Sequence, residues 1–122
     1  MAKATKFADR SHARIYAAWL DLPAWRYLSP IACKLLVAML ARYRPGTNGA
    51  LVWGAREAGQ AVGMSQATGA RALAELEEKG WITVECVGAF ARKNKPSNYA
   101  LTYYPNDVSG EPASLAFEDW RP

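Results

Sequence analysis

The pattern of apolar and polar residues predicts a first long helix that begins near residue 30. Its apolar residues recur at the spacing of one helical face: Ile31, Leu35, Ala38 and Met39. Ser29-Pro30 precedes them and is typical of a helix start, because serine can cap the first turn and proline suits its first position. The pair Pro45-Gly46 ends the helix.

Two further helices follow, separated by a tight turn. Residues 51–53 form a short β-like run, and residues 55–62 predict a helix that closes at Gly63. Ser65 can cap a third helix, which Gly80 ends. The inward face of that helix repeats at helical spacing: Gly69, Ala72, Leu73 and Leu76.

After residue 80 the pattern changes from helical to strand-like. Residues 81–87 and 99–104 are rich in β-forming side chains, and residues 88–98 between them contain glycine, proline and asparagine. We therefore expect a β-hairpin with a long tip. The predicted fold class is α+β and mostly helical, in a chain of 122 residues that is long enough for one core.

The segments that flank this unit are rich in aromatic residues. We divide the chain into an N-terminal extension (1–27), a central domain (28–104) and a C-terminal tail (105–122), with a short helix over residues 15–20 that stops before Pro23. Four of the extension's aromatic residues fit either additional core or a dimer interface: Tyr16, Trp19, Trp25 and Tyr27. The tail has apolar residues that can dock on the domain or on a neighbouring subunit: Leu115, Phe117 and Trp120.

The charge is distributed unevenly along the chain. The net charge is +4, and residues 1–56 contain nine Lys and Arg residues against two acidic ones. A second basic group lies in the predicted hairpin tip: Arg92, Lys93 and Lys95. Such separation favours a polyanionic partner.

The start of the third helix is the candidate binding surface. If Gly69 and its companions pack inward, six residues lie outward or beside the helix N-terminus: Ser65, Gln66, Ala67, Thr68, Ala70 and Arg71. An exposed helix start can approach phosphates with its N–H groups and base edges with its side chains. The alternative is an ordinary amphipathic helix with a solvated outer face.

Residues 28–103 resemble the winged helix-turn-helix DNA-binding proteins of bacteria, phages and mobile elements. The resemblance rests on LSPIACKLLVAML, on NGALVWGAREAGQAVGMSQATGARALAELEEKGWI and on GAFARKNKPSNYALT. It implies a three-helix core with a β-hairpin wing, in which 55–62 is the supporting helix, 65–79 the recognition helix and 87–98 the wing. It also implies double-stranded DNA as the partner.

The sequence contains few of the parts that catalysis requires. His12 is the one histidine, and neither a phosphate-binding loop nor a dinucleotide fingerprint occurs. Cys33 and Cys86 are too few for a disulfide scaffold and lack partners at metal-ligand spacing. We expect no enzyme activity, cofactor, metal or small-molecule ligand.

The sequence also gives an expected cellular location and role. The longest apolar run, residues 35–41, is short for a membrane span, and the N-terminus lacks the apolar core of a signal peptide, so we expect a cytoplasmic, nucleoid-associated protein. Its expected function is transcriptional regulation, as a homodimer on paired half-sites. Two alternatives stay open: a DNA-binding module for plasmid or phage replication or partition, and a winged helix used for protein–protein contact.

Overall fold

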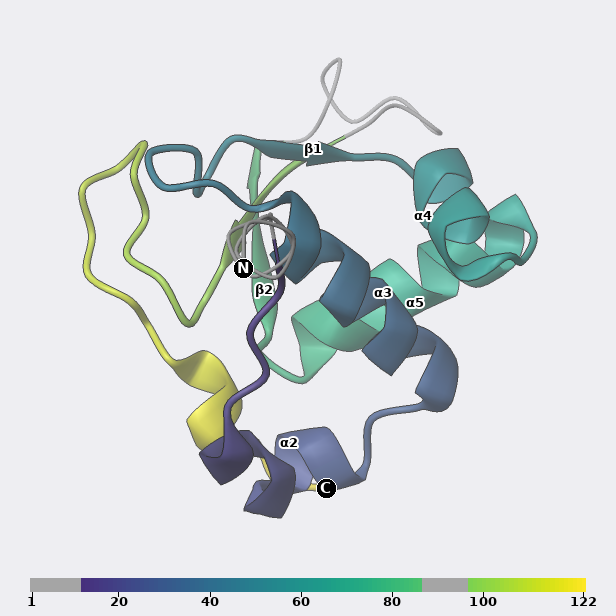
Figure 1. Cartoon of the computed structure of the whole chain (residues 1–122), viewed down its shortest axis with the longest axis horizontal. Coiled ribbons are helices and arrows are strands. Elements are labelled where there is room, and N and C mark those ends of the chain that lie inside the picture. Colours follow the sequence, from purple (N-terminus) through teal and green to yellow (C-terminus); the bar gives the residue numbers. More distant parts are fainter. Residues whose placement is uncertain (1–11, 87–96) are drawn as a thin grey trace, which may run out of the picture.

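A computed structural model describes residues 12–86 and 97–122 (Figure 1). Its four α-helices are α2 (Pro23–Arg26), α3 (Pro30–Arg42), α4 (Ala55–Val62) and α5 (Gln66–Glu78), with 3-10 turns η1 (Ala17–Asp21) and η2 (Ala116–Glu118) near the ends. Its three strands are β1 (Leu51–Trp53), β2 (Ile82–Cys86) and β3 (Ser97–Leu101). The predicted α+β, mostly helical class is confirmed.

The three long helices begin and end where the capping residues predict. The Ser29 hydroxyl accepts a hydrogen bond from the Ala32 amide at 3.1 Å and caps α3. Gly63 closes α4 with a φ of 73°, a left-handed conformation that suits glycine. None of the helices within the described residues has the length and apolar character that a membrane crossing requires.

The sheet is antiparallel, with β3 between β1 and β2. The prediction for the last strand is wrong at both ends, because β3 spans Ser97–Leu101 rather than residues 99–104. The chain turns away after Leu101, where the Thr102 hydroxyl donates to the Gly80 carbonyl at 2.6 Å. The Tyr104 ring then stacks on Tyr43 instead of continuing the strand, with centroids 4.1 Å apart.

The N-terminal extension also differs from its prediction. In place of one helix over residues 15–20, the chain forms the 3-10 turn η1 and then the separate helix α2. The helical turn η1 does end before Pro23, as predicted, but Pro23 also starts α2, because proline fits the first helical position, where its missing N–H has no partner to lose.

The core takes side chains from the beginning, middle and end of the chain. Trp19 of η1 is 3% exposed and packs edge-on against Trp81, with centroids 5.1 Å apart. Phe117 of the tail is fully buried and stacks on Trp81 at 4.3 Å. The tail therefore docks on its own domain, and Figure 1 shows its last part, with η2, beside α2, at the end of the molecule away from α4.

A buried asparagine joins the loop after α3 to the end of the sheet. The Asn48 side chain is fully buried, and its amide donates to the carbonyl oxygens of Leu101, Tyr104 and Pro105 at 2.9–3.2 Å. Its own carbonyl oxygen accepts from the Leu101 amide at 2.7 Å. Sequence reasoning missed this role of Asn48, because its partners lie more than fifty residues away.

We predict that Asn48→Ala destabilises the fold by on the order of 3 kcal/mol, because it leaves a buried N–H and several carbonyl groups unpaired. Urea denaturation measures the change. Asn98→Ala, on β3, is the matched control and should cost under about 1 kcal/mol. Equal losses in the two variants would show that Asn48 is an ordinary loop residue.

Candidate nucleic-acid interface

Helices α4 and α5 cross at a distance that only glycine permits. A Cβ atom added to Gly69 would overlap the Ala55 carbonyl oxygen and the Gly59 nitrogen, and would lie 2.8 Å from the Gly59 Cα. A Cβ added to Gly59 would lie 2.8 Å from the carbonyl carbon of Ser65. The two backbones therefore touch, and this contact fixes the angle at which α5 leaves the turn (Figure 1).

An ion pair ties α4 to the end of α3. Arg42 donates to the Glu57 carboxylate at 2.6 Å, and its guanidinium lies 3.9 Å above the ring centre of Trp53. Trp53 is itself 1% exposed, so the arginine covers a buried ring. Helix α4 is thereby held from both sides, by α3 and by α5.

The predicted binding face of α5 points outward. Gly69, Ala72, Leu73 and Leu76 are buried, as the spacing predicts. Of the six predicted surface residues, Thr68 is half-buried. The other five are exposed: Ser65, Gln66, Ala67, Ala70 and Arg71. Arg56, in the first turn of α4, is exposed as well.

The polar side chains at the start of α5 form a hydrogen-bonded series. The Ser65 hydroxyl accepts from the Thr68 amide at 3.2 Å and donates to the Thr68 hydroxyl at 3.1 Å. Arg71, one turn further along, donates from Nη2 to the same Thr68 oxygen at 3.1 Å. The series brings together three of the predicted site residues and orders the arginine.

Glu75 ties α5 to the start of α3. Its carboxylate accepts from the Ser29 amide and hydroxyl, each at 2.7 Å, and lies 3.4 Å from the Lys79 ammonium. Partial burial raises the pKa of Glu75, but the Ser29 bonds and Lys79 outweigh it and leave that pKa below its ordinary value. Sequence reasoning did not identify this role of Glu75, because a pairing over 46 residues leaves no local signal.

A hollow separates the outer face of α5 from the sheet. It holds about 270 Å³ and is lined on the helix side by Ala70, Ala74 and Glu77, and on the sheet side by Trp53, Ser97 and Tyr99, among others. Burial, together with the charge of Glu77, raises the pKa of Tyr99. The small side chains of Ala70 and Ala74 leave this space open.

The predicted wing residues Arg92, Lys93 and Lys95 lie outside the described residues.

The aromatic residues proposed for a dimer interface are placed unevenly. Trp19 is buried in the core of its own chain, which makes it core rather than interface, while Tyr16 and Trp25 are half-buried against Tyr103 and Trp81. Tyr27 is 61% exposed, so the prediction of a dimer now depends mainly on this residue.

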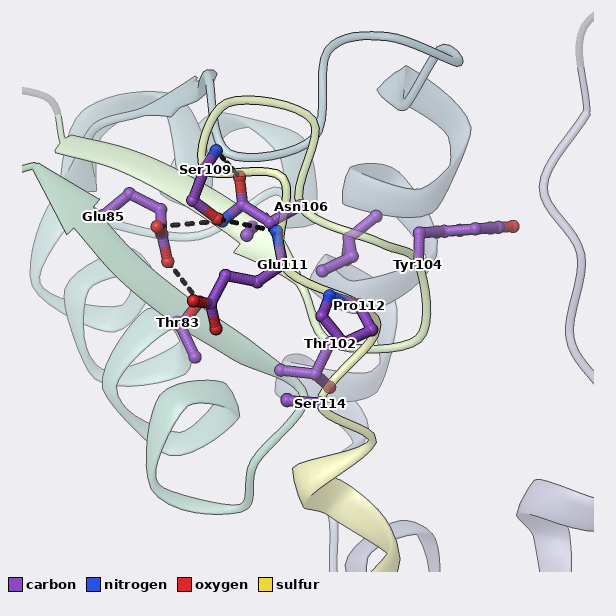
Figure 2. Close-up of a pocket in the computed structure, with 11 residues that line it drawn as sticks. Thr83, Glu85, Thr102, Tyr104, Asn106, Ser109, Glu111, Pro112 and Ser114 are labelled. Atoms are coloured by element: carbon purple, nitrogen blue, oxygen red, sulfur yellow. Dashed lines mark hydrogen bonds between the residues drawn. The ribbon is translucent and has the colours of Figure 1, made fainter.

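A second hollow, of about 300 Å³, lies between the outer face of the sheet and the tail (Figure 2). The Glu85 carboxylate borders it and accepts hydrogen bonds from the Asn106 side-chain amide at 2.9 Å and from the Thr83 hydroxyl at 2.7 Å. Figure 2 shows Glu111 reaching across toward Thr83. Within residues 12–86 and 97–122, no three His, Cys, Asp or Glu side chains gather as a metal site requires.

Comparisons with protein-family models, with curated proteins and with solved structures found no match to this chain. The assignment of a function therefore depends on the residues and geometry above.

We predict that Gly69→Ala destabilises the fold by at least about 2 kcal/mol, although alanine is the better helix former by about 1 kcal/mol. The added methyl group overlaps the α4 backbone, which cannot move aside as a flexible side chain would. Thermal unfolding measures the loss. Ala74→Gly, on the exposed face of the same helix, is the control and should lose only about 1 kcal/mol. A stabilised Gly69→Ala variant would contradict the close crossing.

We predict that Glu75→Gln reduces stability by about 1–2 kcal/mol at pH 7, because Ser29 and Lys79 lose a charged acceptor. The folded-state pKa of Glu75 is lowered, so its stabilisation is complete above its unfolded pKa and is lost as the pH falls through the folded value. The difference between the two proteins should therefore shrink below about pH 4.5.

Urea denaturation of both proteins from pH 7 to pH 3 tests this behaviour. Glu77→Gln, at an exposed position of the same helix, serves as the control. A difference for Glu75→Gln that stays constant over this range would rule out the charged tie.

Proposed function

We propose that this chain is a winged helix-turn-helix protein that binds double-stranded DNA and regulates transcription. The observation that carries the proposal is the outward face at the start of α5, where Gln66 and Arg71 are exposed on a helix whose backbone contacts α4. In this role α4 supports and α5 enters the major groove, which is wide enough to admit a helix.

The charge of the surroundings supports the same proposal. Arg71 and Arg56, which follows Ala55 at the crossing with Gly69, are both exposed, and the α5 N-terminus adds the positive end of its dipole. Two of the acidic residues of α5, Glu77 and Glu78, lie at its C-terminal end, away from the proposed contact. By sequence alone, Arg92, Lys93 and Lys95 belong to the wing of this proposal and supply contacts to phosphates.

Replication or partition of a mobile element requires the same DNA-binding surface, so this role differs from regulation only in where the bound sites lie. A protein–protein role is favoured by a different observation, since Ala67, Ala70 and Ala74 give α5 an exposed alanine face that reads few base edges. Mapping the bound sites in genomic DNA separates promoters from repeated origin sites. A failure to bind DNA favours the protein partner.

We predict that the chain binds duplex DNA with an affinity that falls steeply with salt, by roughly 0.9 in log affinity per log salt for each phosphate neutralised. Gel shifts over a salt series measure this slope. Replacing Lys93 and Lys95 together with alanine should flatten it and weaken binding to every sequence about equally.

Arg71→Ala should cost on the order of 1–3 kcal/mol of specific binding if its guanidinium reads a base. Arg26→Ala is the matched control, because Arg26 is exposed and lies on α2, away from α4 in Figure 1. Binding that resists high salt and is unchanged in all these variants would refute the proposal.

A further inference from the structure

Thr68 is hydrogen-bonded within its own helix. Its hydroxyl oxygen accepts from Arg71 Nη2 at 3.1 Å and from the Ser65 hydroxyl at 3.1 Å. A hydroxyl oxygen has two lone pairs, so both acceptor positions are used inside the helix. The half-buried Thr68 side chain is thus committed to Arg71 and to the cap, while Arg71 itself is exposed.

The carboxylate best placed to capture Arg71 is already engaged. Glu75 follows Arg71 by four residues, a spacing at which acidic and basic side chains on a helix attract each other. Its oxygens instead accept from Ser29 at 2.7 Å and lie 3.4 Å from Lys79. Among the described residues, the ion pairs involve Arg26, Arg42 and Lys79, and none involves Arg71.

An arginine that is ordered by a hydroxyl rather than by a carboxylate keeps its charge and most of its donors for a ligand. Guanidinium carries five N–H donors, and the Thr68 bond engages Nη2. Guanine offers two acceptors, O6 and N7, on its major-groove edge, and paired N–H groups of arginine match them.

We propose that Thr68 is a positioning residue that aims Arg71 at a guanine in the bound DNA. The inference depends on the DNA-binding function proposed above and adds the base that is read and the residue that orders the reader. Thr68 acts through Arg71 and does not contact the base. Hydrogen bonds from Ser29 hold the Glu75 carboxylate, so that the Arg71 guanidinium contacts the DNA rather than this carboxylate.

The test begins with duplexes selected by the wild-type protein from a random pool. Each guanine of the selected duplex is replaced in turn by 7-deazaguanine, which removes the N7 acceptor. We expect one position at which this change weakens wild-type binding by on the order of tenfold and leaves binding by Arg71→Ala unchanged. If every 7-deazaguanine position weakens both proteins equally, Arg71 does not read guanine.

A double-mutant cycle then separates positioning by Thr68 from direct contact. Thr68→Val keeps the shape of the side chain and the Ser65 cap but removes the hydroxyl acceptor. We expect it to weaken binding about three- to tenfold, and Thr68→Ser to restore it. In the Arg71→Ala background the same change should have no effect, because the two residues act as a unit.

Additive losses in the double variant would show that Thr68 contacts DNA by itself and would overturn the inference. So would an unchanged affinity in Thr68→Val. Thermal unfolding of each variant verifies that the fold is intact. If the wild-type protein selects no duplex at all, the proposed DNA-binding function fails and this inference fails with it, an outcome distinct from selective binding that is indifferent to Thr68.

Discussion

The contact between the backbones of α4 and α5 is the constraint on which the rest of the structure depends. A side chain at Gly69 would strike the α4 backbone at Ala55 and Gly59, and one at Gly59 would strike the turn at Met64 and Ser65, so the two helices meet without intervening side chains. The direction of α5 follows from this contact, and with it the placement of every residue on its outer face. The Arg42–Glu57 pair and the Glu75–Ser29 tie then hold the helix pair against α3 from its two ends.

A buried and a half-buried polar side chain link segments that are distant in sequence. Asn48 closes the sheet against the loop after α3, and Glu75 closes the start of α3 against α5. Each is matched by several partners, which a buried polar group requires. The proposed interface thus lies on a framework held by hydrogen bonds as well as by apolar packing, and such a framework suits a surface that must present side chains in one geometry.

Much of this fold was predictable because its signals are local. Serine caps, closing glycines and apolar spacing predicted α3, α4 and α5 and the buried face of α5, and the exposure of Ser65, Gln66 and Arg71 followed from that face. The errors have longer-range causes. Strand β3 ends early because Thr102 and Tyr104 find partners elsewhere in the chain. For Trp19 the sequence left core and dimer interface open, and the packing of Trp81 and Phe117 around it makes it core. The bonds of Glu75 and Asn48 are equally invisible in a local pattern.

The stacking of Phe117 on Trp81 also bears on how the chain folds as it is made. The ribosome delivers the amino-terminal part first, so Trp19, Trp81 and the helices are present before residue 117 emerges. Until then the aromatic cluster lacks the ring that fills its centre and leaves apolar surface open to water. The core is therefore complete only after this late segment has been made. A nascent chain that has not yet reached residue 117 exposes the apolar surface of the cluster and is the form most prone to misassembly.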